Sequence, residues 1–196
     1  MTRFFFTSPG ETLTPAQIAA GFVAVPAAPP TTAPAAGYTW ELGDPQAVQV
    51  NGVWQQNWVQ VVVPLATAQA QAIAQVGAIY LEKIAAGFTY NGVTVGILPA
   101  DIQNITAMAA TAMANIQAAS LGITAPAWPS NFAWLPQGSG ASLPLTAPEM
   151  ITFGAAASHY VSSLILYADS LIAQIQAATT ASAVQAIDIT AGWPTS

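Results

Sequence analysis

The chain has 196 residues, of which 54% are hydrophobic and 5% are charged, where ordinary globular domains carry about 25% charged residues. The formal net charge is −6, and Arg3 and Lys83 are the two cationic residues. This balance argues against binding to nucleic acid or to an anionic membrane surface, because both need clustered lysine and arginine. The absence of cysteine excludes disulfides and thiolate metal sites. Abundant hydrophobic residues with few charges predict a packed core rather than disorder.

The polar surface of such a chain must be built from Thr, Ser, Gln and Asn. A surface with so few charges repels its neighbours weakly, which suits a subunit that is packed inside a large assembly. A compositional bias of the whole lineage is the other interpretation, and the sequence leaves both open.

Residues 1–63 are predicted to form a small β-rich region that docks a partner. Short strands are expected at residues 4–7 and 38–42, and the run Thr14-Pro15-Ala16-Gln17 has the capping box of a short helix. Residues 26–36 (PAAPPTTAPAA) predict an extended proline–alanine linker, which cannot pack as a helix or a strand.

The clearest β signal lies in residues 46–63. Val48 and Val50 alternate with polar residues, and Asn51-Gly52 supplies the two positive-φ residues of a tight hairpin turn. The returning strand is rich in valine and tryptophan, and Pro64 ends it.

Residues 64–196 are predicted to form a mainly helical domain. Long helices are expected at residues 65–87 and 99–120 and for about 30 residues from Thr146, and a second hairpin is expected at residues 88–98. The predicted fold class is therefore α+β, with a small N-terminal β-rich region followed by a bundle of three long helices and an appended hairpin.

The third long helix carries an apolar seam, in which large side chains recur every three or four residues. Its members are Met150, Phe153, Ala157, Tyr160, Leu164, Tyr167, Leu171 and Ile175. Such spacing is typical of a packing surface within one chain. A seam of this length can also pack against another chain, as in a coiled-coil oligomer.

Tryptophans are the candidate partner-binding residues. Trp54 and Trp58 are four apart on a predicted strand, so both face the same side of it, and Trp128 and Trp134 lie in a predicted loop at residues 123–145. Aromatic side chains on an exposed surface can bind proteins or sugars. The alternative is that they pack onto the helices.

The sequence does not indicate the converging titratable side chains that most enzymes need. His159 is the one histidine, and Asp169 lies ten residues further on, an offset that does not put the two close together on one helix face. We expect a hydrogen-bonded packing histidine. The acids are isolated apart from Glu41 and Asp44, and no metal-ligand spacing or phosphate-binding loop occurs. No catalytic residue, cofactor or metal site is predicted, and the chain is not expected to be an enzyme.

Residues 150–168 mimic a membrane span because they carry no formal charge. The stretch contains His159 and several Thr and Ser residues, lacks basic flanks and runs into Asp169. A transmembrane helix normally needs about 20 strongly apolar residues with interfacial anchors. A membrane partner is therefore not expected.

The first hairpin and the helix after it resemble a segment of known phage proteins. Residues 50–59 read VNGVWQQNWV, and a predicted long helix follows them. This resembles the hairpin-then-helix segment of phage tail-fibre and tail-fibre-assembly proteins.

The order of elements over residues 82–193 extends the resemblance. It is carried by the segments FTYNGVTV (88–95), DIQ (101–103), NFAW (131–134), LTAPE (145–149), IAQIQAA (172–178) and GWP (192–194). This order resembles an uncharacterised domain that is common in tailed phages and prophages. That domain usually has charged helices, and here Ala, Gln, Thr and Ser replace most of the charges. The resemblance implies a virion-associated or fibre-assembly role and brings no catalytic residues.

Sequence and resemblance together favour a structural protein of the phage tail virion, a tail-fibre or baseplate-associated component that joins or supports fibres. The expected partners are other phage tail proteins, with homo-oligomers as a further option, and the expected location is the virion after synthesis in the host cytoplasm. Two alternatives remain open: a tail-fibre assembly chaperone that is absent from the mature particle, and a carbohydrate-binding adhesin module.

Overall fold

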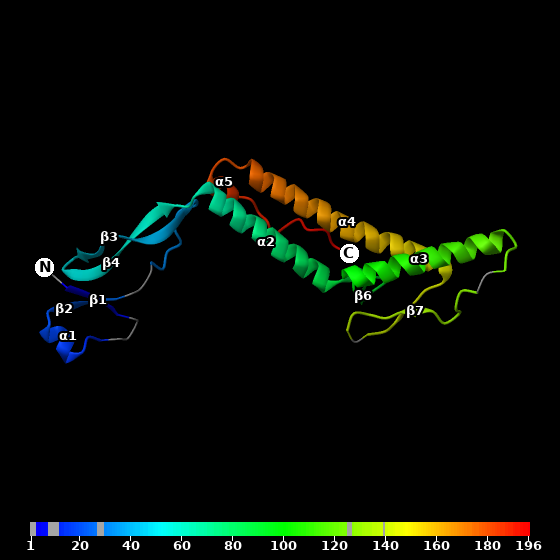
Figure 1. Cartoon of the computed structure of the whole chain (residues 1–196), viewed down its shortest axis with the longest axis horizontal. Coiled ribbons are helices and arrows are strands. Elements are labelled where there is room, and N and C mark those ends of the chain that lie inside the picture. The colour runs from blue at the N-terminus through cyan, green and yellow to red at the C-terminus, as the bar shows by residue number, and fades with distance from the viewer. Residues whose placement is uncertain (1–2, 8–11, 27–29, 125–126, 139) are drawn as a thin grey trace. The chain divides into compact units, whose positions relative to one another are not determined.

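The computed structural model describes residues 3–7, 12–26, 30–124, 127–138 and 140–196 (Figure 1). Its elements in chain order are β1 (Arg3–Thr7), α1 (Pro15–Ala19), β2 (Phe22–Pro26), β3 (Tyr38–Val50), β4 (Val53–Val62), α2 (Leu65–Ala86), β5 (Phe88–Tyr90), β6 (Val93–Val95), α3 (Pro99–Ser120), β7 (Ala133–Trp134), β8 (Leu143–Pro144), α4 (Ala147–Ala177) and α5 (Ala181–Gln185). The expected α+β class is confirmed. Throughout the described residues the strands form two-stranded sheets.

The chain divides into two compact units. The first comprises Met1–Ala70 together with Ala178–Ile187, and the second comprises Gln71–Ala177 together with Asp188–Ser196. This division differs from the expected boundary after residue 63, because α5 belongs with the N-terminal region. The backbone N–H of Gly37 donates to Oε1 of Gln185 at 2.6 Å, across a separation of 148 residues.

In the first unit, β1 pairs with β2 in parallel and β3 pairs with β4 in antiparallel. Strand β2 was not expected, and it takes up the first residue of the predicted linker, of which residues 27–29 lie outside the described residues. The register between β3 and β4 breaks between Leu42 and Ala47, so the two strands expected there form one irregular strand. The predicted turn is confirmed, with φ of 50° at Asn51 and 81° at Gly52.

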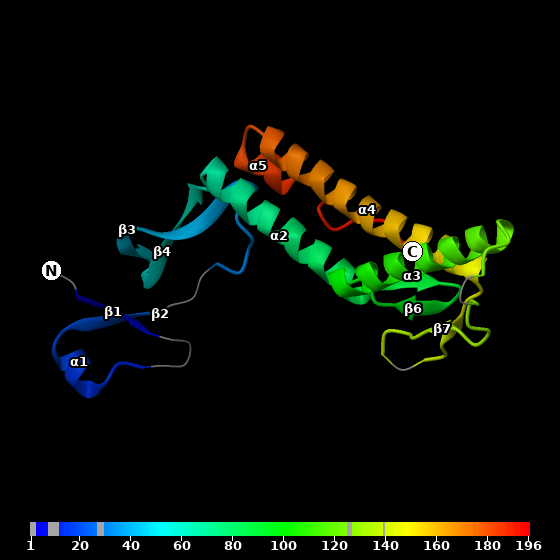
Figure 2. The same ribbon diagram turned by 45° about the vertical axis from the view of Figure 1, so that its right-hand side comes forward.

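In the second unit, α3 and α4 run in opposite directions and pack on each other (Figures 1 and 2). A Cβ atom at Gly154 of α4 would lie 2.8 Å from the Cβ of Ala109 of α3, so the two backbones approach closely. The hairpin of β5 and β6 turns at Asn91 (φ 49°) and Gly92 (φ 77°), as predicted. The expected loop at residues 123–145 contains the short antiparallel pair β7 and β8.

The three long helices are present and α3 packs on α4, so the predicted bundle is matched in part. Helix α2 does not pack along α3 or α4 as a third bundle helix, and both views show residues 188–196 between α2 and α4 (Figures 1 and 2). The side chains of α2 give a physical reason. The helix buries Ala68, Val76 and Ile84, and its many Ala and Gln residues leave it with a narrow apolar face. Trp193 of the segment 188–196 is 7% exposed, and its ring packs against Tyr167 of α4.

The seam of α4 lies on the buried side of the helix. Its members Met150, Phe153, Ala157, Tyr160, Leu164, Leu171 and Ile175 are buried. Tyr167 is half-buried, and its ring packs against Trp193 with the centroids 5.2 Å apart. The seam is therefore covered largely within the chain.

Among the described helices, α4 is the one that is long and apolar enough to cross a membrane by length and composition. Its most apolar window has a mean hydropathy of 1.2, and 33% of that window is buried. A helix that is buried inside a folded domain passes the same test, so this property alone is weak support for a membrane span.

Candidate binding surfaces

The first unit contains a hollow of about 610 Å³ on the β3–β4 hairpin. Its lining includes Trp40, Trp54, Trp58, Gln55, Gln56 and Asn57. The predicted pair Trp54 and Trp58 is thus brought together with a third tryptophan, which was not singled out from the sequence. The signal that would have found Trp40 is its position in the expected strand at residues 38–42.

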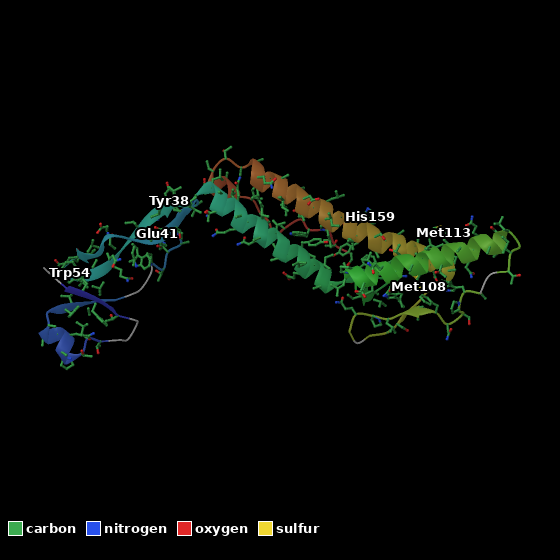
Figure 3. All side chains as sticks on the ribbon, viewed as in Figure 1. Tyr38, Glu41, Trp54, Met108, Met113 and His159 are labelled. Atoms are coloured by element: carbon green, nitrogen blue, oxygen red, sulfur yellow. The ribbon has the colours of Figure 1, made fainter. Side chains whose placement is uncertain are left out.

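Pairing across the hairpin fixes where these rings lie. Trp54 stands opposite Gln49 and Trp58 stands opposite Leu42. The ring of Phe4 from β1 packs on Trp54 with the centroids 4.7 Å apart. Figure 3 labels Trp54 on the hairpin. Nε1 of Trp40 donates to the carbonyl of Thr32 at 3.0 Å. All three tryptophans of the hollow are partly exposed, so their rings are held in place and still reach solvent.

The lining of the hollow combines apolar side chains with uncharged amides. None of the described residues that line it is charged. Glu41 is the nearest acid in sequence to Trp40. It pairs with Val59, so it lies on the opposite face of the hairpin from Trp40 and Trp58. Oε1 of Gln56 is buried without a hydrogen-bond partner, and no other buried side-chain nitrogen or oxygen in the described part of the chain shares that condition.

The structure places the other two predicted tryptophans in an aromatic cluster of the second unit. Trp134 packs on Phe153 of α4 at 5.8 Å between centroids, and Trp128 packs on Phe132 at 4.8 Å. Nε1 of Trp128 donates to the carbonyl of Leu145 at 2.9 Å. These contacts are intramolecular, which favours the packing interpretation for Trp128 and Trp134.

The same cluster continues into the hairpin of β5 and β6. Phe88 contacts Phe153 and Tyr160, with centroid separations of 6.3 and 5.4 Å. Burial raises the pKa of the Tyr160 phenol, as expected for a group whose charged form loses hydration. The cluster therefore fixes the hairpin and the aromatic loop onto α4.

A second candidate surface is the C-terminal part of α3, which extends past the start of α4 in both views (Figures 1 and 2). The exposed apolar side chains here, with exposed fractions between 40% and 65%, are Met113 and Ile116 of α3 and Leu121 and Ile123 just after its last residue. Figure 3 labels Met113 on this part of the helix. Leu81, Ile165 and Leu166 are further exposed apolar side chains on α2 and α4.

The expected packing histidine was wrong. His159 is exposed on the surface of α4 (Figure 3) and lies in a shallow hollow with the C-terminal residues 194–196. Its position follows from the seam, because the residue next to the buried Tyr160 is turned outward by about 100° of helix rotation. No group of three or more His, Cys, Asp or Glu side chains that could hold a metal occurs among the described residues.

Comparison with known proteins gives one family. A family model described as "Domain of unknown function (DUF4376)" matches residues 67–191, which is more than half of the chain. No curated protein and no solved structure matches the chain.

Proposed function

We propose, on the premise that the chain belongs to the DUF4376 family, that it is a structural component of a phage tail which works by protein–protein contact. The phage context rests on the resemblance of residues 50–59 and 82–193 to tail-fibre and tail-fibre-assembly proteins. The observation that carries the contact role is the exposed apolar end of α3.

The end of α3 and the residues just after it form an apolar surface, defined by the exposed side chains of Met113, Ile116, Leu121 and Ile123. Met113 and Ile116 are three residues apart and lie on one face of α3, and Leu121 and Ile123 come directly after the helix ends at Ser120. The sequence has no charged residue between Asp101 and Glu149, so no charge in this segment would repel a neighbouring chain. Contiguous exposed apolar side chains mark protein contacts, and the cores of interfaces are depleted in charge.

The partner proposed for this surface is another tail protein, from the fibre or the baseplate. In the described part of the chain, α3 extends past the start of α4 and its last turns carry exposed apolar side chains, which a partner helix or strand would bury. Burying the four side chains contributes about 1.5–3 kcal/mol for each one that becomes fully covered.

The test uses the phage or prophage particle that encodes the chain. We expect mass spectrometry and side-chain-resolution imaging of purified particles to contain the protein, with the end of α3 covered by a neighbouring chain. Ile116→Glu should reduce incorporation, because it buries an unpaired charge at the contact. Ile18→Glu, at an exposed isoleucine of α1 (62% exposed, against 40% for Ile116), is the control and should incorporate normally.

The same experiment separates the chaperone alternative. A protein that raises the yield of folded fibre in co-expression but is missing from purified particles would contradict the structural role and support a tail-fibre assembly chaperone. Normal incorporation of Ile116→Glu would contradict the surface that we assign.

A further inference from the structure

We propose that the hollow on the β3–β4 hairpin binds a neutral saccharide, with sugar rings lying on Trp40 and Trp58 and a sugar hydroxyl donating to Gln56. This inference uses residues of the first unit only and does not depend on the tail role proposed above. Three properties of the hollow carry it: its aromatic lining, its uncharged amides and its unsatisfied acceptor.

The size and lining of the hollow fit a small-molecule site. A volume of about 610 Å³ lies within the roughly 300–1,000 Å³ of typical ligand pockets, which combine apolar walls with a few placed polar groups. Three tryptophans and Val48 supply apolar wall, and Gln55, Gln56 and Asn57 supply amides. A flat, apolar ring face beside donors and acceptors matches a pyranose, which has apolar C–H faces and a hydroxyl-bearing edge.

The rings are held before any ligand arrives. Phe4 packs on Trp54, and Nε1 of Trp40 is bonded to the carbonyl of Thr32. Trp58 is fixed in the strand opposite Leu42. A fixed aromatic platform lowers the entropy that is lost on binding, so partial exposure of these rings does not imply a disordered surface.

Gln56 supplies an unsatisfied hydrogen-bond acceptor. Its Oε1 is buried and has no partner within the protein, a condition that costs about 1–3 kcal/mol. The oxygen belongs to a residue that lines the hollow, and a ligand hydroxyl can donate to it once the amide rotates towards the hollow. A purely apolar occupant would leave the acceptor unsatisfied, whereas a sugar satisfies it.

The lack of charge in the lining restricts the class of ligand. No described lining residue carries a charge, and the chain holds only two cations. A phosphate or a sulfated sugar would therefore lack a counter-charge. A cationic ligand would lack a carboxylate in the same way. The ligand that fits is neutral and rich in hydroxyl groups.

The test measures binding by the full chain to a panel of neutral oligosaccharides, namely maltotetraose, cellotetraose, triacetylchitotriose and lacto-N-tetraose. Calorimetry and tryptophan fluorescence are read together, because a sugar on the rings changes the emission. At least one member should bind with an affinity of millimolar or better. Trp58→Ala should weaken that binding by about tenfold or more, since truncating a stacked tryptophan removes a principal contact.

Gln56→Leu is the second variant, because it keeps the volume and removes the acceptor. It should weaken binding by about fivefold or more, while Gln103→Leu, at an exposed glutamine of α3, leaves the affinity unchanged. Circular dichroism checks that each variant is folded. The proposal is overturned if no panel member binds, if binding survives both Trp58→Ala and Gln56→Leu, or if an uncharged extended peptide binds the hollow and the sugars do not.

Discussion

Gly154 of α4 faces Ala109 of α3 so closely that a Cβ atom at position 154 would lie 2.8 Å from the Cβ of Ala109. Real Cβ atoms do not approach that closely, so the crossing point of the two helices depends on the missing side chain at residue 154. The neighbouring buried side chains Ile105 and Phe153 have relative exposures of 0%. The contact therefore lies in the core of the second unit, where there is little room to adjust.

Gly154→Ala should destabilise the second unit although it raises helix propensity. The added methyl group gains up to about 1 kcal/mol of helix propensity and costs about 1–3 kcal/mol through overpacking against Ala109. Gly77→Ala is the matched control, because Gly77 lies inside α2 with nothing within 4 Å of its missing Cβ. That variant should stabilise by about 0.5–1 kcal/mol. Urea unfolding followed by circular dichroism measures both.

The double variant Gly154→Ala with Ala109→Gly sharpens this comparison. It removes the opposing methyl group and should recover part of the stability that Gly154→Ala loses. Equal stabilisation by Gly154→Ala and Gly77→Ala would show that the helices do not meet at residue 154.

Gly87, which ends α2, should tolerate alanine less well than Gly92 in the following turn. Both have positive φ, 85° and 77°, so alanine pays a similar backbone penalty of about 1–2 kcal/mol at each. Only at Gly87 would the Cβ collide with other atoms, the carbonyl oxygen of Val95 and Oε1 of Gln137. We expect Gly87→Ala to cost about 1–3 kcal/mol more than Gly92→Ala. Similar unfolding midpoints for the two variants would contradict this.

Local chemistry made most of the elements predictable. The Asn-Gly pairs at 51–52 and 91–92 demand positive φ, and both turns have it. Thr14 and Gln17 form the expected capping box at the start of α1. Such features depend on a few neighbouring residues, so the sequence specifies them without knowledge of the rest of the fold.

Long-range packing was harder to predict. Nothing local indicates that α5 would bind Gly37 through Gln185, or that residues 188–196 would lie beside α2. Strand β2 depends on its parallel partner β1, since the segment is too short to signal a strand by alternation.

The candidate site shows the same division between local and long-range features. Trp54 and Trp58 were found because they share a strand, whereas Trp40 joins them only through the register of β3 against β4. Trp128 and Trp134 are equivalent candidates by residue type. Their contacts with Phe132 and Phe153 depend on a loop folding back onto α4, which composition does not reveal.

Asp188 should make the stability of the protein depend on pH in the acid range. Hydrogen bonds from the hydroxyl and N–H of Thr190, and from the N–H of Ala191, lower the pKa of its carboxyl group. A lowered pKa in the folded state means that its contribution is fully present above the ordinary pKa of an aspartate. The contribution is then lost as the pH falls through the lowered value.

Asp188→Asn keeps an acceptor oxygen and removes the charge. The free energy of unfolding of the unmodified protein should exceed that of this variant at neutral pH, and the difference should shrink towards low pH. Asp169→Asn, at an exposed acid on α4 outside this turn, is the control. A difference between the unmodified protein and Asp188→Asn that stays constant from neutral to strongly acid pH would contradict the assignment.

Trp193 should be the residue that holds the C-terminal segment in the second unit. It is 7% exposed, its Nε1 donates to the carbonyl of Ile189 at 2.9 Å, and its ring meets Tyr167. Trp193→Ala should therefore lower the free energy of unfolding by about 3–5 kcal/mol. Tyr167→Phe removes only the hydrogen bond from the phenol to the carbonyl of Ala191 and should cost about 0.5–1.5 kcal/mol.

Comparing the losses of stability in Trp193→Ala and Tyr167→Phe shows whether residues 188–196 are held by packing of the indole ring or only by the hydrogen bond from Tyr167. If the segment were held mainly by the phenol, the two variants would lose similar amounts and amide exchange in residues 188–196 would rise equally in both. If the ring of Trp193 packs against α4, Trp193→Ala should raise amide exchange in residues 188–196 more than Tyr167→Phe does, because the ring and its hydrogen bond to Ile189 are both lost.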